Sequence, residues 1–473
     1  MRKFLLVFIF FVLASCKLGP DYKMPEIKFS DLWHGNTQAT KNVPLEENEL
    51  WWKIFKDPVL NDLMDQAAEH NHDIRIAVAS IEEARALRSI SAGSLWPEIG
   101  GNTNAEKQGL STRSSNNNNN NGAKERDTFS ADLDASWELD IFGKNRRSVE
   151  VAEAELEAAE ENKRDVMIAI LAEVARNYFE VRGLQKRIAV TEHNIELFKE
   201  VEGMAEARVE QGVVTELDLA SARGERESAE STLPNLQADM AAGIYRLSVL
   251  TGQVPETYLD VLERHAPLPA PPDVVPVGLR SDLLKRRPDV RKAERELAAA
   301  TAGIGAAKAD LFPSFSLTGA VGSSASVFSD LFTGEAATYS IGQAINWSLF
   351  KGGALQASID AAEASEKGAY INYEKTVLEA LEEAETSLTR YGREWQTLKS
   401  LKSSEKTRQT AFEIAFLRYS EGEENFLVVL DAERSLVSVQ DGVIQSETRI
   451  LSNLTQLYKA LGGSWTSGVR KTQ

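Results

Sequence analysis

Cysteine and histidine are scarce in this sequence. Cys16 is the only cysteine, which excludes an intramolecular disulfide. The five histidines are dispersed, and the pair His70 and His72 would diverge on a helix, which argues against a metal site. A glycine-rich phosphate loop and a serine nucleophile motif are missing as well. These absences predict a protein that is not an enzyme and that uses no metal or cofactor.

Positive charge is in deficit, with 53 basic residues against 71 acidic ones and a formal net charge of −18. Nucleic-acid binding needs a basic surface, so this balance argues against such a partner. Long apolar runs are also scarce. The run at residues 4–13 is too short for a membrane helix, which needs about 20 residues, and no later segment has the pattern of one. If the chain crosses a bilayer, it must do so with β-strands.

The N-terminus has the pattern of an export signal. Arg2 and Lys3 precede the apolar run, and the segment Leu13-Ala14-Ser15-Cys16 resembles the bacterial lipobox, in which cleavage precedes a lipidated cysteine. We therefore expect a signal peptide at residues 1–15, lipidation of Cys16 and a lipid-anchored segment at residues 16–60. The alternative is a plain secretory signal with an incidental cysteine.

The sequence contains one pattern twice. Residues 71–97 match residues 287–313 at a shift of 216, whereas Trp137 matches Trp347 at a shift of 210. The six-residue difference falls in an interval that contains six consecutive asparagines, residues 116–121, which we expect to form a solvent-exposed loop. The predicted organisation is a first repeat at residues 61–264, a proline-rich linker at 265–280, a second repeat at 281–463 and a tail at 464–473.

Each repeat is predicted to contain long coiled-coil helices. Apolar residues recur at steps of four and three, from Val377 to Leu398 in the second repeat and from Met167 to Val181 in the first. A continuous helix over residues 146–210 would be about 95 Å long. That length is too great for an ordinary globular domain.

Four strands are predicted between the helices, at about residues 97–109, 129–142, 313–324 and 339–350. The second of these alternates strictly, with its apolar side chains on one face and four carboxylates on the other: Asp132, Asp134, Glu138 and Asp140. Strands of about ten residues suit a tilted crossing of a bilayer, although a strand of a soluble sandwich would also alternate. The lipobox and the repeated strand–helix order favour the membrane.

Four strands are too few to close a membrane barrel, since the smallest use about eight. Three copies would provide twelve strands. The predicted fold is therefore mainly α with a membrane β part: a long coiled-coil α-helical barrel and a 12-stranded β-barrel formed by a homotrimer. The carboxylates would then line the pore.

Several motifs together resemble one known family. They are Cys16 in its lipobox, residues 19–22 (GPDY), residues 51–60 (WWKIFKDPVL), residues 137–143 (WELDIFG), residues 286–290 (RRPDV) and residues 419–422 (YSEG). The sequence resembles the outer-membrane factors of bacterial tripartite efflux pumps, the TolC-like channels, in their lipoprotein branch. This resemblance implies a homotrimeric channel in the cell outer membrane that extends into the periplasm. It also implies coupling to an inner-membrane pump through a periplasmic adaptor, or membrane fusion protein.

The resemblance also implies a closed periplasmic end. By their position in the family's pattern, Leu427 and Asp431 would form the constriction, and Arg434 would pair with Asp431. In the first repeat, the residue that corresponds to Val428 is Asp218, a further candidate for the constriction. The number of carboxylate rings stays open, because family members differ there. The alternative is an exposed Asp431–Arg434 helix pair without a function.

The turns at residues 211–215 and 421–425 are the implied adaptor contacts. The residues concerned are Gly212, Val213, Thr215, Gly422, Glu423 and Asn425. The alternative for these turns is a helix end with its usual glycine. For the whole chain, the rival function is a lipid-anchored periplasmic coiled-coil scaffold or adaptor, which would explain the helices and leave the four strands unexplained.

Overall fold

The computed structural model describes residues 17–27, 29–35, 40–41, 50–109, 125–272 and 274–463. Cys16 and the asparagine run at 116–121 lie outside this part of the chain. The fold divides into two compact units. One draws on Met1–Glu26, Ser80–Ala159 and Lys292–Tyr373, and the other on Ile27–Ala79, Glu160–Arg291 and Glu374–Gln473.

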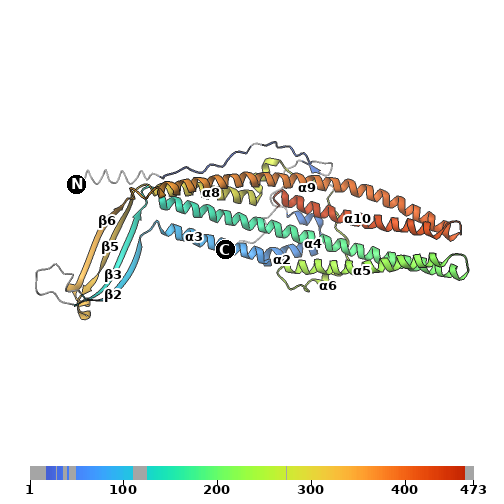
Figure 1. Cartoon of the computed structure of the whole chain (residues 1–473), viewed down its shortest axis with the longest axis horizontal. Helices are drawn as coiled ribbons and strands as arrows, with labels where there is room; N and C mark the ends of the chain where they lie inside the picture. The colour runs from blue at the N-terminus through green and yellow to red at the C-terminus, as the bar shows by residue number, and fades with distance from the viewer. Residues whose placement is uncertain are drawn as a thin grey trace. The chain divides into compact units, whose positions relative to one another are not determined.

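The first unit contains one antiparallel sheet of four strands in the order β2-β3-β5-β6 (Figure 1). Its strands are β2 (Glu98–Gly109), β3 (Glu125–Leu139), β5 (Ser314–Ala325) and β6 (Ala337–Asn346). The sheet joins two hairpins, because β3 of the first hairpin pairs with β5 of the second. The two 3₁₀ turns η3 (Phe328–Phe332) and η4 (Gly334–Ala336) connect β5 to β6. The strands β2 and β6 form the two edges.

Two strands, β3 and β6, differ from their predicted bounds by more than one residue. β3 begins four residues before residue 129 and ends at Leu139, because the chain turns there and Asp140 caps the helix that follows. β6 spans Ala337–Asn346, and the chain after it turns through a hydrogen bond from Leu349 N to Trp347 O (3.1 Å). Alternation in the sequence therefore continues past the points where strand pairing stops.

Helices make up most of both units. The long ones are α3 (His72–Gly93), α4 (Lys144–Glu210), α5 (Glu216–Leu250), α8 (Pro288–Ala309), α9 (Ala354–Ser420) and α10 (Phe426–Ala460). The shorter elements are η1 (Trp51–Phe55), α2 (Pro58–His70), α6 (Leu259–Leu262), η2 (Arg280–Asp282), α7 (Leu283–Arg286) and the strand pair β1 (Thr40–Lys41) with β4 (Val275–Pro276). Among the described helices, none is long and apolar enough to span a membrane.

The long helices and the first strands of the two halves correspond position by position. Both ends of α8 are related to those of α3 by the sequence shift of 216, and the same holds for β5 and β2. Both ends of α9 and α10 are related to those of α4 and α5 by the shift of 210. Individual contacts repeat as well: Asn71 Nδ2 donates to Leu250 O (2.8 Å), and Arg287, the counterpart of Asn71, donates to Ala460 O (2.9 Å). The two halves therefore share local geometry as well as element order.

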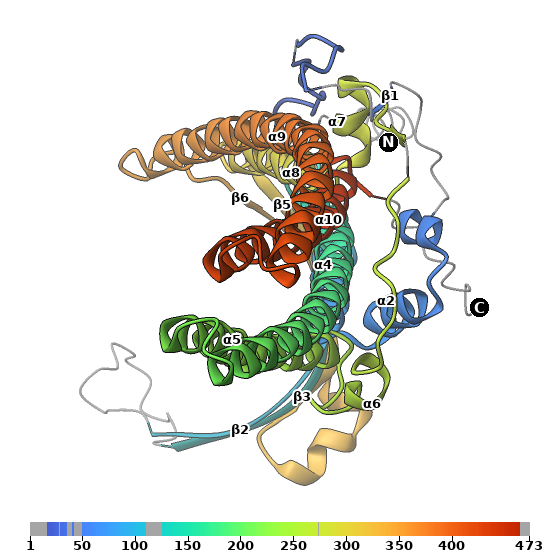
Figure 2. The same cartoon turned by 90° about the vertical axis from the view of Figure 1, so that its right-hand side faces the viewer.

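In the second unit, the heptad positions of the long helices are buried. Val174, Tyr178 and Val181 on α4 and Val377 and Leu388 on α9 are all fully inaccessible to solvent. The helices are also joined by ion pairs, such as Arg187 with Asp441 (2.6 Å) between α4 and α10. Figure 2 shows the α4–α5 and α9–α10 hairpins beside each other. Apolar packing with charged groups at its margins thus holds the helices together.

Candidate functional site

The sheet has one apolar face that is exposed to solvent. Residues opposite one another in the register share a face, and the odd-numbered positions of all four strands fall on the same side. The large apolar side chains exposed on this face are Ile99, Leu133, Trp137, Leu317, Val321, Tyr339, Ile341 and Ile345. Ile341 is 90% exposed and Tyr339 is 85% exposed. A contiguous exposed apolar surface of this kind indicates an interaction with a membrane or another protein.

The opposite face is polar and acidic. Asp132, Asp134 and Glu138 on β3 all lie on this face. Glu106 on β2 shares it, because Glu106 lies opposite Thr128, an even-numbered neighbour of Asp132 on β3. Glu106 was absent from the residues predicted from sequence, because β2 alternates weakly.

Glycines face two of these carboxylates across the strands. Gly322 lies opposite Asp132, and a Cβ atom on Gly322 would come within 2.3 Å of Asp132 Oδ1. Gly100 lies opposite Asp134, where an added Cβ would be 3.1 Å from both carboxylate oxygens. The missing side chains leave room for the carboxylates to lie across the neighbouring strand.

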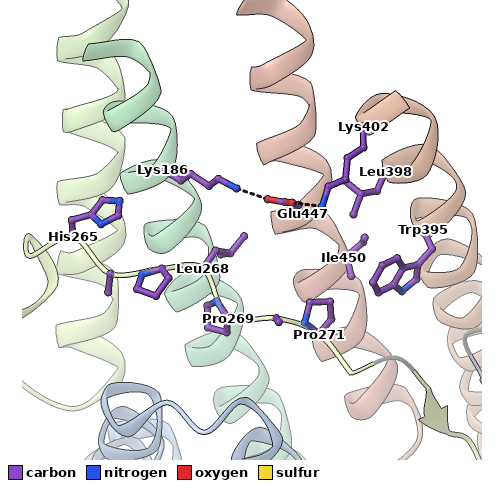
Figure 3. A pocket seen from close by; sticks show the side chains of 13 residues that line it. Lys186, His265, Leu268, Pro269, Pro271, Trp395, Leu398, Lys402, Glu447 and Ile450 are labelled. Carbon is purple, nitrogen blue, oxygen red and sulfur yellow. Dashed lines mark hydrogen bonds and ion pairs between the residues drawn. The ribbon is translucent and has the colours of Figure 1, made fainter. Parts of the chain in front are cut away.

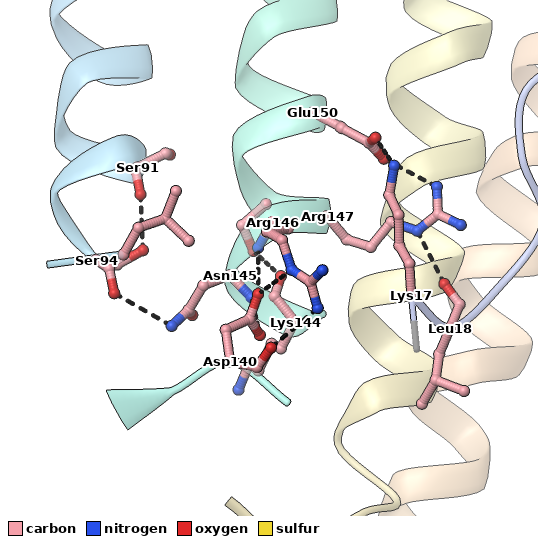
Figure 4. A network of polar contacts seen from close by, with 12 residues as sticks. Lys17, Leu18, Ser91, Ser94, Asp140, Lys144, Asn145, Arg146, Arg147 and Glu150 are labelled. Atoms are coloured by element: carbon pink, nitrogen blue, oxygen red, sulfur yellow. Dashed lines mark hydrogen bonds and ion pairs between the residues drawn. The ribbon is translucent and has the colours of Figure 1, made fainter. Parts of the chain in front are cut away.

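Asp140 does not belong to the acidic strand face, contrary to the prediction. It follows the end of β3 (Figure 4). Its side chain is only 11% exposed. One carboxylate oxygen accepts from Asn145 N (3.1 Å), and the other accepts from Arg146 N (2.9 Å) and Arg146 Nε (3.0 Å). A carboxylate that satisfies free amides at the start of a helix stabilises that helix. Asp140 therefore caps α4.

The residues that follow Cys16 are bound to the beginning of α4 and to α8. Arg147, whose side chain is 3% exposed, donates to Leu18 O (2.8 Å) and pairs with Asp21 (3.0 Å). Lys17 pairs with Glu150 on the same helix (Figure 4). At Gly305 on α8, an added Cβ would lie 2.6 Å from Leu18 O, so the two backbones approach closely. This segment is fixed beside the end of β3.

The turns of the two helical hairpins have the same backbone geometry. Gly212 and Gly422 adopt φ values of 72° and 82°, in the left-handed region that favours glycine. In both turns, the amide after the glycine donates to the carbonyl five residues earlier at 2.9 Å: Val213 to Arg208, and Glu423 to Arg418. Val213 is 66% exposed. Both turns therefore have the same hydrogen-bonded backbone, and most of their side chains are exposed to solvent.

Arg208 connects the two hairpins at this end. Its guanidinium lies over the ring of Tyr419, 4.1 Å from the centroid, and donates to Tyr419 O (2.9 Å) and Ser420 O (3.1 Å) at the end of α9. Arg418, its counterpart in the second repeat, pairs locally with Glu424 (3.3 Å). The α4 and α9 ends are thus joined through a cation–π contact and two hydrogen bonds.

The helices after the turns begin with side-chain caps. Asn425 Oδ1 accepts from Leu427 N (3.0 Å) at the start of α10. At the start of α5, Asp218 accepts from Thr215 N (3.0 Å) and Thr215 Oγ1 (2.9 Å). Asp218, predicted as a possible member of the constriction, therefore has its carboxylate engaged in a helix cap.

Leu427 and Asp431 lie one turn apart on the exposed surface of α10. Leu427 is 46% exposed, and Asp431 has no hydrogen bond or ion pair to any residue that the structure describes. The predicted Asp431–Arg434 pair is wrong: Arg434 pairs with Glu225 on α5. Glu225 is 17% exposed and reaches Arg434 from the neighbouring helix, so Arg434 is not the partner of Asp431.

Glu433 is a buried carboxylate that sequence reasoning missed. It is fully inaccessible to solvent on α10, and within the described residues neither of its carboxylate oxygens has a hydrogen-bond partner. Burial alone raises its pKa to about 7. Glu433 lies on the buried face of α10 with Val429, Leu430 and Leu436, but no sequence signal shows that it lacks a partner.

A hollow of about 650 Å³ lies under the proline-rich linker in the second unit (Figure 3). Glu447 is the single carboxylate among the described residues that line it, and it is held between Lys186 Nζ (2.7 Å) and Lys402 Nζ (2.8 Å). Although burial acts in the opposite direction, hydrogen bonds from both lysines lower the pKa of Glu447. These charges satisfy one another and join α4, α9 and α10. No cluster of three or more metal-ligating side chains occurs in the described ranges.

Comparison with known proteins identifies the family. The sequence profile described as outer membrane efflux protein matches residues 63–253 and 279–463. The chain is 32% identical to the probable efflux pump outer membrane protein TtgC of Pseudomonas putida over 462 residues, which are 96% of this chain and 94% of that protein. It is also 32% identical to the solvent efflux pump outer membrane protein SrpC of Pseudomonas putida, over 98% of both chains.

Solved structures agree with this result. The structure of the outer-membrane channel OprN has a TM-score of 0.89 and 35% sequence identity, over 95% of this chain and 100% of that one. The open state of the Neisseria gonorrhoeae MtrE outer membrane channel has a TM-score of 0.81 and 26% identity, over 95% and 99%. The chain therefore belongs to the outer membrane efflux protein family.

Proposed function

We propose that this protein is the outer-membrane channel of a tripartite efflux system and works as a homotrimer. It would carry substrates from an inner-membrane pump and a periplasmic adaptor, the membrane fusion protein, to the cell exterior. The observation that carries this proposal is the four-stranded sheet, which has an exposed apolar face, an acidic face and two edges that have no strand partner among the described residues. The role is transport, without catalysis or a cofactor.

Three copies would close the sheet into a 12-stranded β-barrel in the outer membrane. The apolar face would contact lipid, which suits side chains such as Ile341 and Tyr339 that are almost fully exposed in a single chain. The acidic face, with Asp132, Asp134 and Glu138, would line the water-filled lumen. The long helices of the three copies would form an α-helical barrel in the periplasm.

Lipidation of Cys16 would add an anchor in the outer membrane. The binding of Lys17 to Glu150 and of Leu18 to Arg147 supports this assignment, because both contacts lie near the end of β3. Acyl chains on the preceding residue would then enter the lipid around the strands. A lipid chain places a protein on the membrane and does not make it span the bilayer.

The hairpin turns at residues 211–215 and 421–425 are the proposed adaptor contacts. Their exposed side chains and hydrogen-bonded backbone suit docking of a partner. Next to them, Leu427 and Asp431, repeated three times, would close the resting channel by a hydrophobic constriction and a ring of carboxylates. The capped carboxylate of Asp218 makes it a weaker candidate for that ring.

The test is to purify the protein from membranes and to compare its gel mobility with and without boiling. A trimeric membrane barrel is expected to migrate at an altered position until it is boiled, and to form ion-conducting channels in planar bilayers. A lipid-anchored periplasmic scaffold would give one heat-independent band and no conductance, and that result would refute the proposal.

A further inference from the structure

The proline-rich linker of the second unit is held at both ends and crosses a hollow between them. At one end, Arg182 on α4 donates to Arg264 O (3.1 Å). At the other end, Tyr391 Oη on α9 lies 3.5 Å from Pro272 O. Among the described residues, none forms a hydrogen bond with residues 265–271. The linker therefore bridges the space from α4 to α9, past the side of α10 (Figure 3).

The bridge is stiff. Its residues Pro267, Pro269 and Pro271 alternate with small or apolar residues. A proline ring fixes one backbone dihedral angle and has no N–H group, and proline-rich segments act as extended spacers. The linker therefore resists collapse onto α10 and keeps open the hollow of about 650 Å³ beneath it. Small-molecule sites in proteins commonly have volumes of about 300–1,000 Å³.

Most side chains around the hollow are apolar. Leu268 and Trp395 line it and are half-buried, and Leu398 and Ile450 line it and are buried. The indole ring of Trp395 and the proline rings of the linker offer flat surfaces against which an aromatic ring can pack. An apolar hollow with a few polar groups is typical of a site for a small molecule.

The hollow has a surplus of positive charge. Its ionisable lining residues, within the part of the chain that the structure describes, are Lys186, Lys402, Glu447 and His265. Glu447 contacts both lysines but balances the charge of only one of them. The lysine side chains are 41% and 53% exposed, and an ammonium group has three N–H donors. Donors and one unbalanced charge thus remain for an anionic group.

We propose that the hollow binds a small molecule that has an aromatic body and one anionic group. The anionic group accepts from Lys186 or Lys402, and the aromatic body lies against Trp395 and the linker prolines. The charge of the lining attracts an anion and repels a cation. All of these residues belong to one unit of a single chain, so the site does not rest on the proposed homotrimer.

The position of the linker indicates where the ligand comes from. Within the second unit, Figure 2 shows the linker, between α6 and α7, on the convex side of the curve formed by α9, α4 and α5. In the proposed helical barrel, this side faces the periplasm and the concave side faces the lumen. The ligand is therefore a periplasmic molecule and not the transported substrate. This statement of its source rests on the proposed function, whereas the ligand class does not.

The test uses anilinonaphthalene sulfonate, an aromatic monoanion, and the full-length protein in lipid nanodiscs. The matched ligand is phenyl naphthylamine, which has the same aromatic body without the sulfonate. Energy transfer from tryptophan to the dye is measured after subtraction of empty nanodiscs, and Trp395→Phe identifies the part that arises at the hollow. The parent protein is expected to bind the anion saturably and about fivefold more tightly than the neutral analogue, the size of effect that one exposed charge pair has.

Substitutions of the charged residues are expected to change the affinity in opposite directions. Lys402→Gln removes the surplus positive charge and should weaken binding of the anion about fivefold, with little effect on the neutral analogue. Glu447→Gln increases the surplus charge and should tighten binding by a similar factor. The double variant restores the parent charge, so its affinity should return to near the parent value. Misfolding cannot produce this pattern, because it would weaken binding in every variant.

Lys375→Gln is the matched control on α9. Lys375 pairs with Glu379 (3.6 Å), its side chain is 67% exposed, and it does not line the hollow. This substitution changes the net charge of the protein as much as Lys402→Gln does. It should leave the affinity for the anion unchanged.

Three results would contradict the proposal. If the parent protein shows no saturable binding, the hollow is not a site for aromatic anions. If Trp395→Phe and Lys402→Gln both behave like the parent, the dye binds elsewhere. If Lys375→Gln weakens binding as much as Lys402→Gln, the effect arises from the net charge of the protein. Gel mobility and conductance of the same preparations test the proposed function separately: a conducting trimer that does not bind the anion refutes only the site.

Discussion

The guanidinium of Arg434 on α10 pairs with the carboxylate of Glu225 on α5, two helices that belong to different repeats. This contact lies one turn beyond Asp431 and joins α10, on which we propose the constriction, to its neighbour α5. The side chain of Arg434 is 57% exposed, so the pair is expected to contribute about 1 kcal/mol or less. It biases the position of α10 without holding the fold together.

Arg434→Ala is therefore expected to loosen α10 and to raise single-channel conductance in planar bilayers, with little change in the temperature at which the trimer dissociates. Glu225→Gln should have the same effect, and combining both substitutions should add little. Additive effects of the two substitutions would show that the residues act independently.

Leu427→Ala with Asp431→Ala is expected to widen the constriction. Truncating the exposed leucine removes a barrier to wetting, and removing the carboxylate opens the ring further. Conductance should rise severalfold and large antibiotics should enter cells, while trimer stability stays near that of the parent. A matched control is Leu217→Ala, at the corresponding place on α5. Unchanged conductance at every voltage would place the constriction elsewhere.

Neutralising Asp132, Asp134 and Glu138 is expected to reduce cation selectivity, because these carboxylates would give the proposed lumen face a negative potential. The measurement is the reversal potential across a salt gradient at low ionic strength, where screening is weak. Asp140→Asn is the control. It should leave selectivity unchanged, because Asp140 caps α4 and lies off the strand face. Equal effects of Asp140 and the strand carboxylates would contradict this assignment.

Gly322→Ala is expected to destabilise the sheet by about 1–3 kcal/mol, the usual cost of overpacking. The new Cβ would lie 2.3 Å from both Ala131 O and Asp132 Oδ1, and the first of these is backbone that cannot rotate away. Gly319→Ala on the same strand meets nothing closer than 3.8 Å and should be tolerated. Heat-induced dissociation followed on gels compares the two variants.

Glu433 is expected to make the packing around α10 depend on pH. Its pKa in the folded chain is raised by burial to about 7, from an ordinary value of 4.5. The folded state therefore binds the proton more tightly than the unfolded state, so stability is fully present below pH 4.5 and is lost as pH rises through 7. The difference between these limits is on the order of 3 kcal/mol.

Hydrogen exchange of α10 amides at pH 5 and pH 8, corrected for the intrinsic rate, measures this effect. Protection should be greater at pH 5 in the parent protein, and Glu433→Gln should remove the difference. A difference that persists in the glutamine variant would assign it to another group.

Periodicity in the sequence was sufficient to predict the strands and the long helices, because both depend on which faces are apolar. The burial of Val174 and Val377 and the exposure of Ile341 follow from patterns that a single chain displays. The ends of β3 and β6 could not be predicted from the sequence pattern. A strand ends where its pairing ends, and the alternation of apolar and polar residues does not mark that point.

The errors in the site have a common physical cause. Asp140 shares the spacing of Asp132 and Asp134, and only its hydrogen bonds to Asn145 and Arg146 distinguish it. Spacing along one helix placed Asp431 near Arg434, but a longer reach across the interface connects Arg434 to Glu225, 209 residues away. Local spacing cannot rank a near partner against a remote one.

The strand order β2-β3-β5-β6 has a consequence for how this protein can change. Counterpart strands differ in how they pair: β3 and β5 pair with each other within one chain, whereas the outer edges of β6 and β2 would be paired only between copies in the proposed homotrimer. A substitution at Ala135 therefore affects the pairing of β3 with β5 within a single chain. A substitution at Ile345 affects the pairing of β6 with β5 within a chain. In the proposed homotrimer it also affects the contact between copies, and this second part of its penalty grows weaker as the concentration of chains in the membrane increases.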